Sequence, residues 1–369
     1  MSYRAYVEVD LGVIAHNIQT IRSRTDAKVL AVVKADAYGH GLVPVAQAAL
    51  RAGASWLGVA LLEEAISLRK AGITDPIIAW LTPPGDDFPL ALQHNIDLSI
   101  SSVTVLKEII DCAKVLGVKP RIHIEVDTGM RRGGFLAEWQ DFLKVLKDHL
   151  HEVQIVGLWT HFARADEPDA DFTELQIVEY EKYLSELQGE GIHPEIIHMS
   201  NSAATLAFSQ AHKNMVRAGI AMYGLSPDIA QMGPGSKYGL QPAMLLKAKL
   251  SLVKFAPKGS AVGYGGTSIL REDTHLGVVV MGYSDGIPRN TSAQAGVYVA
   301  GKRAPLVGRV SMDQFVVDLG SSTEAKAGDY VTVFGGEGYS IDEWALAAGT
   351  INYEIVTRIA SRVPRMYVN

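Results

Sequence analysis

Residues 31–41 of the chain read Ala-Val-Val-Lys-Ala-Asp-Ala-Tyr-Gly-His-Gly, with Lys34 at the end of an apolar run. The run from Val29 to Val33 contains no polar side chain, which is typical of a parallel strand buried on both faces. Lys34 would then lie at the carboxyl end of a strand, where parallel barrels and open α/β sheets place their functional groups. Burial disfavours the ammonium form of a lysine, and a neutral lysine can form a Schiff base. The alternative is a lysine that extends from the strand into solvent.

Short apolar runs rich in β-branched residues recur after this strand, with helix-like stretches between them. We expect strands at about 28–33, 55–60, 77–81, 96–100, 121–126, 154–159, 195–199 and 216–222. The intervening segments 62–71, 102–116, 136–150 and 170–188 have apolar residues at helical spacing. This alternation predicts an α/β protein with a (β/α)8 TIM barrel, whose site lies at the carboxyl ends of the strands.

Glycine and proline interrupt this alternation between Ser226 and Pro242, as expected for a connection between domains. Beyond it, apolar runs separated by glycine-rich turns predict a mainly β domain, with one helix at 341–348 and a last strand at 365–368. We therefore predict a barrel domain over residues 1–240 and a mainly β C-terminal domain over 241–369.

Composition excludes several classes of function. The chain has 369 residues, of which 48% are hydrophobic and 20% charged, and a formal net charge of -6. The acidic balance argues against a nucleic-acid surface, and no apolar run is long enough to span a membrane. One cysteine, Cys112, leaves no internal disulfide and no cysteine-based zinc site, so we expect a cytoplasmic protein without a structural metal.

The string around Lys34 resembles the cofactor-lysine motif of alanine racemases, pyridoxal-phosphate (PLP) enzymes with a (β/α)8 barrel and a β-rich second domain. The resemblance continues along nearly the whole chain. It implies that PLP is held as a Schiff base on Lys34 and that Tyr38 binds its phosphate. His161, in Trp159-Thr-His-Phe-Ala163, matches the histidine that stacks on the cofactor ring.

Further strings match the family's cofactor ligands. Ser200-Asn-Ser-Ala-Ala204 and Arg217-Ala-Gly-Ile220 follow or form the last two expected strands. The residues that match the family's phosphate ligands are Ser202, Gly219, Ile220 and, near the end of the chain, Tyr353. Arg217 matches the arginine that faces the pyridine nitrogen, where a permanently charged donor keeps the nitrogen unprotonated. Without the resemblance, Asn-Ser-Ala-Ala is simply a good start for a helix.

The segment Glu125-Val-Asp-Thr-Gly-Met-Arg-Arg132 resembles the family's Asp-Thr-Gly-Met-x-Arg string. The arginine that matches Arg132 binds the substrate carboxylate, which suits a planar guanidinium. Many racemases have a carbamylated lysine where this chain has Glu125. Our hypothesis is that Glu125 supplies the negative charge instead and orients Arg132.

In the second domain, Ala261-Val-Gly-Tyr-Gly-Gly-Thr267 resembles the segment that carries the family's second base, here Tyr264. Racemisation removes a proton from one face of Cα and returns one to the other, so two groups must flank the reacting carbon. Lys34 and Tyr264 would be these groups, with Tyr264 deprotonated through His161 and Arg217. Taken alone, a tyrosine between glycines is a turn residue.

Gly282-Tyr-Ser-Asp-Gly286 also fits the Gly-x-Ser-x-Gly pattern of α/β-hydrolases. Those enzymes order their triad as Ser, Asp and His, and no histidine follows His275. The string instead resembles the racemase segment in which Tyr283 lies near the substrate. Met312 matches a residue that helps to bind the substrate carboxylate, and Ile287 replaces a frequent tyrosine near the entrance.

The resemblance implies interconversion of L-alanine and D-alanine, which supplies D-alanine for peptidoglycan. It also implies a homodimer in which Tyr264, Tyr283 and Met312 act on the barrel of the other subunit. A racemase of another small amino acid is an alternative. A PLP-dependent decarboxylase would need a carboxylate in place of Arg217, and a non-catalytic PLP carrier would lack the second domain.

Overall fold

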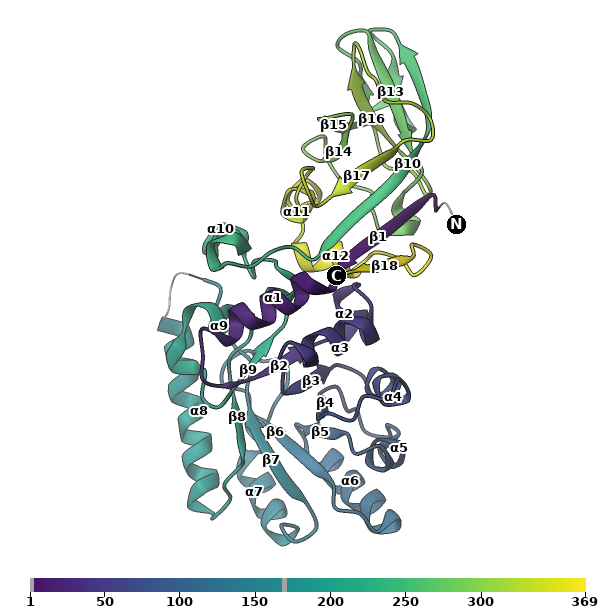
Figure 1. Ribbon diagram of the computed structural model, residues 1–369. Coiled ribbons are helices and arrows are strands. Elements are labelled where there is room, and N and C mark those ends of the chain that lie inside the picture. The colour runs from purple at the N-terminus through teal and green to yellow at the C-terminus, as the bar shows by residue number, and fades with distance from the viewer. Residues whose placement is uncertain (1–2, 168–170) are drawn as a thin grey trace. The chain divides into compact units, whose positions relative to one another are not determined.

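The computed structural model describes residues 3–167 and 171–369. The chain forms two compact units, which Figure 1 shows. The barrel unit comprises Val13–Ala37 and Leu42–Gln241. The β unit comprises the N-terminal segment as far as Gly12, then Tyr38–Gly41 and Pro242–Asn369.

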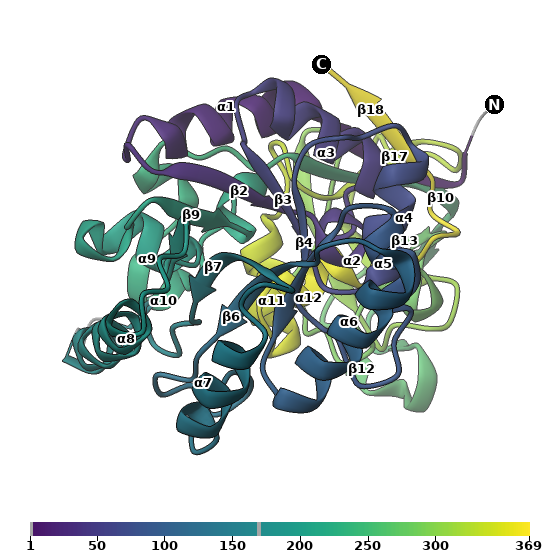
Figure 2. The same ribbon diagram turned by 90° about the horizontal axis from the view of Figure 1, so that it is seen from below.

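Eight parallel strands form the barrel unit, as the sequence predicts (Figures 1 and 2). They are β2 (Lys28–Val32), β3 (Trp56–Val59), β4 (Ile77–Ala79), β5 (Asp97–Ile100), β6 (Arg121–Glu125), β7 (Gln154–Trp159), β8 (Ile196–His198) and β9 (Met215–Ala218). Neighbours in sequence pair in parallel from β2 to β8, and β2 also pairs with β9. The amide of Arg217 donates to the carbonyl of Ser200 at 3.0 Å, which brings β9 beside β8 and closes the barrel.

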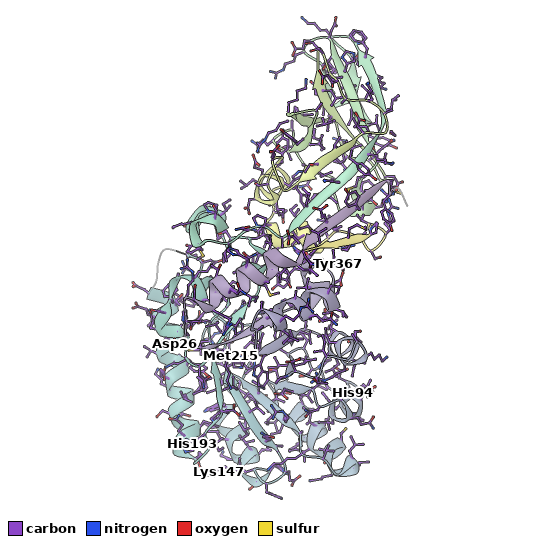
Figure 3. The ribbon with its side chains drawn as sticks, in the orientation of Figure 1. Asp26, His94, Lys147, His193, Met215 and Tyr367 are labelled. Atoms are coloured by element: carbon purple, nitrogen blue, oxygen red, sulfur yellow. The ribbon has the colours of Figure 1, made fainter. Side chains whose placement is uncertain are left out.

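Helices lie around these strands in Figure 2. Their bounds are α1 (Leu11–Arg22), α3 (Leu42–Arg51), α4 (Leu62–Lys70), α5 (Phe88–Gln93), α6 (Val103–Leu116), α7 (Trp139–Asp148), α8 (Asp171–Gly189), α9 (Ser202–Ala207) and α10 (Ile229–Met232). α6 has a clear start and stop, with a Ser102 hydroxyl that accepts from the amide of Val105 and a left-handed Gly117 after the last turn. His94, Lys147 and His193, labelled in Figure 3, lie where helices lead into strands, at the amino-terminal end of the barrel.

The β unit is an eight-stranded sheet in the order β13-β16-β15-β14-β17-β10-β1-β18. The strands are β1 (Ala5–Asp10), β10 (Met244–Ala256), β13 (Thr274–Val279), β14 (Gly296–Val299), β15 (Lys302–Val307), β16 (Phe315–Gly320), β17 (Tyr330–Phe334) and β18 (Arg365–Val368). A small hairpin of β11 (Ala261–Val262) and β12 (Ser268–Ile269) lies apart from this sheet, and the helices are α11 (Ile341–Ala348) and α12 (Asn352–Thr357).

The N-terminal strand departs from the predicted domain division, which placed residues 1–240 in the barrel. β1 instead pairs antiparallel with β10 and parallel with β18. Its side chains alternate between buried and partly exposed, as in a sheet with one face on a core. The pairing partners lie at the far end of the chain, so the local pattern does not reveal which sheet the strand joins.

Among residues 3–167 and 171–369, no helix has the length and apolar character needed to cross a membrane.

Candidate active site

Lys34 follows β2 at the carboxyl end of the barrel strands. Burial lowers the pKa of its amine, the charge of Arg132 lowers it further, and Glu64 partly opposes this. The amine lies 6.0 Å from the centroid of the Trp80 ring. Such a lysine gives up its proton more easily than one in water, which suits it for covalent or base chemistry.

A left-handed turn follows Lys34. Four successive non-glycine residues, Ala35 to Tyr38, have φ between 53° and 54°. This conformation costs an L-residue roughly 1–2 kcal/mol each, so the turn needs support from its surroundings. The Glu64 carboxylate supplies some of it, because it accepts from the amide of Ala35 at 2.6 Å and from that of Ala60 at 2.9 Å.

Tyr38 ends the left-handed turn and belongs to the β unit, as does Tyr353 at the start of α12. The centroids of their rings are 6.1 Å apart. Burial raises the pKa of the Tyr38 hydroxyl, which therefore stays protonated and able to donate. The two tyrosines that match phosphate ligands are thus neighbours within this unit.

Arg217 is buried in β9, and carbonyl groups surround its guanidinium. It donates to the carbonyls of Thr160 at 2.8 Å, His198 at 3.0 Å and Met199 at 3.1 Å. Burial lowers its pKa to about 10, while Glu125 and Tyr180 act in the opposite direction. The guanidinium remains charged at neutral pH and is held in one orientation.

His161 lies beside Arg217, with its Nδ1 atom 3.3 Å from Nη2 of the arginine. Burial, followed by the charges of Arg217, Arg132 and Lys34, lowers the pKa of His161 well below its usual value. The ring is therefore neutral. Because the arginine can only donate, Nδ1 of His161 accepts and the proton resides on Nε2.

Ser202 and the Arg217-Ala-Gly-Ile220 string meet at one place. The Ser202 hydroxyl accepts from the amide of Gly219 at 2.9 Å and from that of Ala221 at 3.3 Å. Asn201 precedes α9, and its side-chain oxygen accepts from the amide of Ala204. Peptide N–H groups and a hydroxyl at one spot are the groups that bind a phosphate in barrels of this type.

Glu125 ends β6, and its carboxylate lies against the backbone that follows Arg132. A Cβ atom added at Gly133 would be 3.1 Å from both carboxylate oxygens. Burial raises the pKa of Glu125 to about 7, although Arg217 and Arg132 both act to lower it. The charge at this position therefore changes near neutral pH. Arg131 and Arg132 are both exposed, and Arg131 lies 3.5 Å from the Asp127 carboxylate.

Gln176, a buried residue of α8 that connects two of these loops, was not identified from the sequence. Its side-chain oxygen accepts from the amide of Ala163 at 3.0 Å. Its nitrogen donates to the Thr128 hydroxyl at 3.1 Å and to the carbonyl of His161 at 3.3 Å. One amide thus joins the loop of His161 to the loop that leads to Arg132. In sequence, Gln176 is one polar residue of an amphipathic helix.

The residues expected to act from the second domain are exposed on the β unit. The relative exposure is 69% for Tyr264, 39% for Tyr283 and 54% for Met312. The amides of Tyr283 and Ser284 donate to the carbonyls of Ser311 and Met312, both at 3.0 Å, so these two loops lie side by side. Ile287 is buried, and its side chain does not contribute to the surface that these residues form.

Ser284 does not have the surroundings of a hydrolase nucleophile. Its hydroxyl donates to the carbonyl of Met312 at 2.7 Å and lies 3.0 Å from the Asp313 carboxylate. It lies within a short 3-10 turn, Tyr283–Asp285, and no α-helix directly follows this turn. The neighbouring Asp285 is buried and pairs with Arg4 and Arg362 at 2.5 Å each. These contacts give the string a structural role in the β unit.

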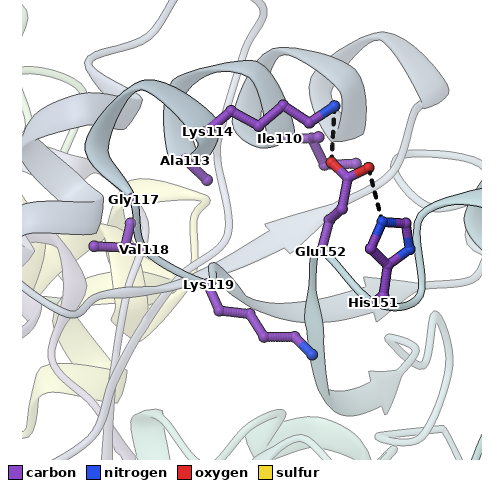
Figure 4. A pocket seen from close by; sticks show the side chains of 8 residues that line it. All are labelled: Ile110, Ala113, Lys114, Gly117, Val118, Lys119, His151 and Glu152. Carbon is purple, nitrogen blue, oxygen red and sulfur yellow. Dashed lines mark ion pairs between the residues drawn. The ribbon is translucent and has the colours of Figure 1, made fainter.

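A surface hollow lies elsewhere on the barrel unit, between the end of α6 and the turn before β7 (Figure 4). Lys114 and His151 both approach Glu152 there, at 2.8 Å and 3.5 Å. Because these residues precede strands, the hollow is at the amino-terminal end of the barrel and separate from Lys34. Within the described parts of the chain, no group of His, Cys, Asp and Glu is suited to hold a metal ion.

Comparisons with known proteins find similarity to alanine racemases over nearly the whole length of the chain. The family model described as "Alanine racemase, N-terminal domain" matches residues 9–227, and "Alanine racemase, C-terminal domain" matches residues 243–367. An alanine racemase of Salinispora tropica is 44% identical over 99% of this chain and 98% of its own length. One of Beutenbergia cavernae is 46% identical over 100% and 99%.

Solved structures of alanine racemases are also similar to this chain. The crystal structure of alanine racemase from D-cycloserine-producing Streptomyces lavendulae has a TM-score of 0.97 and 43% identity, and covers 100% of this chain and 98% of that one. The alanine racemase of Bacillus anthracis with bound L-Ala-P has a TM-score of 0.91 and 38% identity, over 100% and 96%.

Proposed function

The chain belongs to the alanine racemase family, and on this premise we propose that it interconverts L-alanine and D-alanine with Lys34 and Tyr264 as the two proton-transferring groups. The observation that carries the proposal is the arrangement at the end of the barrel. There, a lysine with a lowered pKa lies within electrostatic range of Arg132, and a buried, charged Arg217 orients a neutral His161.

The residues present fit PLP as the cofactor. Lys34 would hold it covalently, and the Ser202 hydroxyl with the backbone at Gly219 and Ile220 would bind its phosphate together with Tyr38 and Tyr353. When bound, PLP withdraws electrons from Cα of the amino acid and so acidifies the Cα hydrogen. Arg217 would face the pyridine nitrogen as a charged donor, which keeps that nitrogen unprotonated and limits the reaction to proton transfer.

The proton steps follow from the state of each side chain. The lowered pKa of Lys34 favours the neutral amine, which can accept the Cα proton on one face. Tyr264 would serve the other face. It would act from the second subunit of a homodimer, and its exposure together with that of Met312 supports such a contact surface. We further propose that Arg132 and Met312 bind the alanine carboxylate, that Tyr283 lies nearby, and that the protein works in the cytoplasm to supply D-alanine for peptidoglycan.

The direct test is to incubate the purified protein with PLP and L-alanine in deuterated water and to follow optical activity and deuterium at Cα together. Loss of optical activity with deuterium gained at Cα is the expected result. Alanine that stays unlabelled and optically pure would exclude alanine racemisation. The same assay with L-serine and other small amino acids, and with detection of carbon dioxide, would then identify the alternative racemase or a decarboxylase.

Glu125→Gln tests whether this carboxylate orients Arg132. We expect the KM for alanine at about pH 8 to rise about tenfold, the scale of one interaction with a charged group. Below the pKa of about 7 the wild-type carboxyl is itself neutral, so the difference between variant and wild type should shrink at about pH 6. Glu138→Gln, at the start of α7, is the matched control. An unchanged KM at both pH values would contradict the hypothesis.

Wild type and Glu125→Gln should also differ in how their stability depends on pH. The pKa of Glu125 is raised from 4.5 to about 7 by burial, so between these values the folded state binds a proton that the unfolded chain has released. Protonation of Glu125 therefore stabilises the folded state. This stabilisation is fully present below the unfolded pKa of 4.5 and is lost as the pH rises through the folded pKa of about 7. Thermal denaturation should therefore show a smaller decrease in Tm from about pH 5 to about pH 8 for Glu125→Gln than for wild type.

A further inference from the structure

A continuous chain of buried hydrogen bonds extends from Arg217 through the inside of the barrel, away from the proposed active site. Nη1 of Arg217 is 3.3 Å from Nδ1 of His198, and Nε2 of His198 is 3.1 Å from Nδ1 of His123. Nε2 of His123 is in turn 3.2 Å from Oδ2 of Asp97. All four residues are at most 4% exposed.

The chain ends on an ion pair at the opposite end of the barrel. Asp97 is the first residue of β5, and Arg121 is the first residue of β6. Nε and Nη2 of Arg121 donate to the two oxygens of Asp97 at 2.6 Å and 3.1 Å. The guanidinium therefore compensates the buried carboxylate from the partly exposed end of the strand.

The chemistry of the groups fixes the direction of every bond. A guanidinium can only donate, so Nδ1 of His198 accepts, and the proton of this neutral ring must be on Nε2. That proton is donated to Nδ1 of His123, whose own proton is then on Nε2 and is donated to Asp97. This order of donors requires a group at its end that only accepts, and the Asp97 carboxylate is such a group.

The neighbouring rings and charges support a neutral His198 and fix the orientation of both rings. Burial, followed by Arg217 and His123, lowers the pKa of His198 well below its usual value. Trp159 stacks on His198 with ring centroids 5.8 Å apart, and Trp56 meets the His123 ring edge at 5.3 Å. Neither ring can turn over without disturbing a packed aromatic neighbour.

We propose that Asp97, His123 and His198 are positioning residues that hold Arg217 in its working orientation by locking both histidines in the Nε2–H tautomer. If His198 carried its proton on Nδ1, that N–H would point at an N–H of Arg217, and the repulsion would displace the guanidinium. Asp97 prevents this from the far end of the barrel, by accepting the last proton of the series. The inference rests on the proposed function, in which Arg217 faces the cofactor.

The first experiment reads the tautomers directly. The holoenzyme, labelled with ¹⁵N-histidine, is examined by long-range ¹H–¹⁵N correlation, with His123→Gln and His198→Gln used to assign the signals. We expect the Nε2–H pattern for both rings. An Nδ1–H or doubly protonated pattern for either ring would overturn the proposal. This readout requires no turnover, so a protein with the expected tautomers that does not racemise alanine would refute the proposed function and leave the chain of hydrogen bonds intact.

The second experiment removes the terminal acceptor charge. Asparagine can accept or donate, so Asp97→Asn permits either tautomer of His123. We expect new Nδ1–H signals and a kcat about tenfold lower, as for other partners that fix a histidine tautomer, with KM and PLP affinity within about twofold of wild type. Asp141→Asn on α7, an exposed aspartate paired with Lys144, is the control. Unchanged tautomers or an unchanged kcat would overturn the proposal, and the wild-type spectrum decides it if Asp97→Asn does not fold.

Discussion

Lys34→Ala is expected to lower racemisation by about 10⁴-fold or more, because one residue provides both the covalent hold on PLP and one of the two proton-transferring groups. The fold should be unaffected, since the side chain follows β2 at a barrel end and is not part of the hydrophobic core. Borohydride reduction of the PLP-loaded wild type should leave the cofactor attached to the peptide that contains Lys34. The variant should retain no label.

Lys70→Ala at the end of α4 is the matched control, because it removes a lysine from the barrel surface without touching the site. Adding a small amine to Lys34→Ala should restore part of the rate, which a merely structural role would not allow. Racemisation near the wild-type rate in the variant, or a label on another lysine, would remove Lys34 from the mechanism.

Tyr264→Phe is expected to lower racemisation by about 10²- to 10⁴-fold, the range for loss of one general acid or base. The two enantiomers have equal free energy, so net racemisation must fall equally in both directions. The loss of one of the two bases should instead make the two enantiomers differ in isotope exchange at Cα. One enantiomer should still exchange its Cα hydrogen with deuterated water through Lys34, without inversion, while exchange of the other should almost stop.

Phenylalanine keeps the ring and removes only the hydroxyl, so PLP binding should be unchanged. Tyr330→Phe, a tyrosine of β17 whose hydroxyl contacts the carbonyl of Tyr3, is the control in the same unit. Equal exchange of both enantiomers in Tyr264→Phe would show that Lys34 or another group serves both faces, and full activity would exclude Tyr264 as a base.

The barrel was predictable because short, mostly apolar runs alternate along the chain with segments of helical spacing. β2 shows this well, with four successive buried residues after its first. The roles of Lys34, Arg132 and Arg217 were predicted from a resemblance to a family, and they stay predictions. The left-handed turn was not predictable, because Ala35, Asp36 and Ala37 carry no signal for positive φ; Glu64, distant in sequence, supports it.

The buried polar residues inside the barrel were also not predictable from the sequence. His123 is the middle residue of β6, His198 ends β8 and Asp97 begins β5, so each has an ordinary local context. Their importance comes from pairings between β5, β6, β8 and β9 that only the closed barrel creates. Gln176 is similar, since nothing in the pattern of α8 distinguishes a buried amide from a surface one.

The position of β1 has a consequence for how the protein is made. The strand is synthesised before the barrel, but its partners are β10, which starts at Met244, and β18, which ends at Val368. On the ribosome, the entire barrel therefore emerges while this strand still has both edges open. A strand whose edges are unpaired during synthesis can pair wrongly with a strand of another nascent chain. In β1, the alternating Tyr6, Glu8 and Asp10 interrupt the apolar run and make such contacts less favourable until the end of the chain arrives.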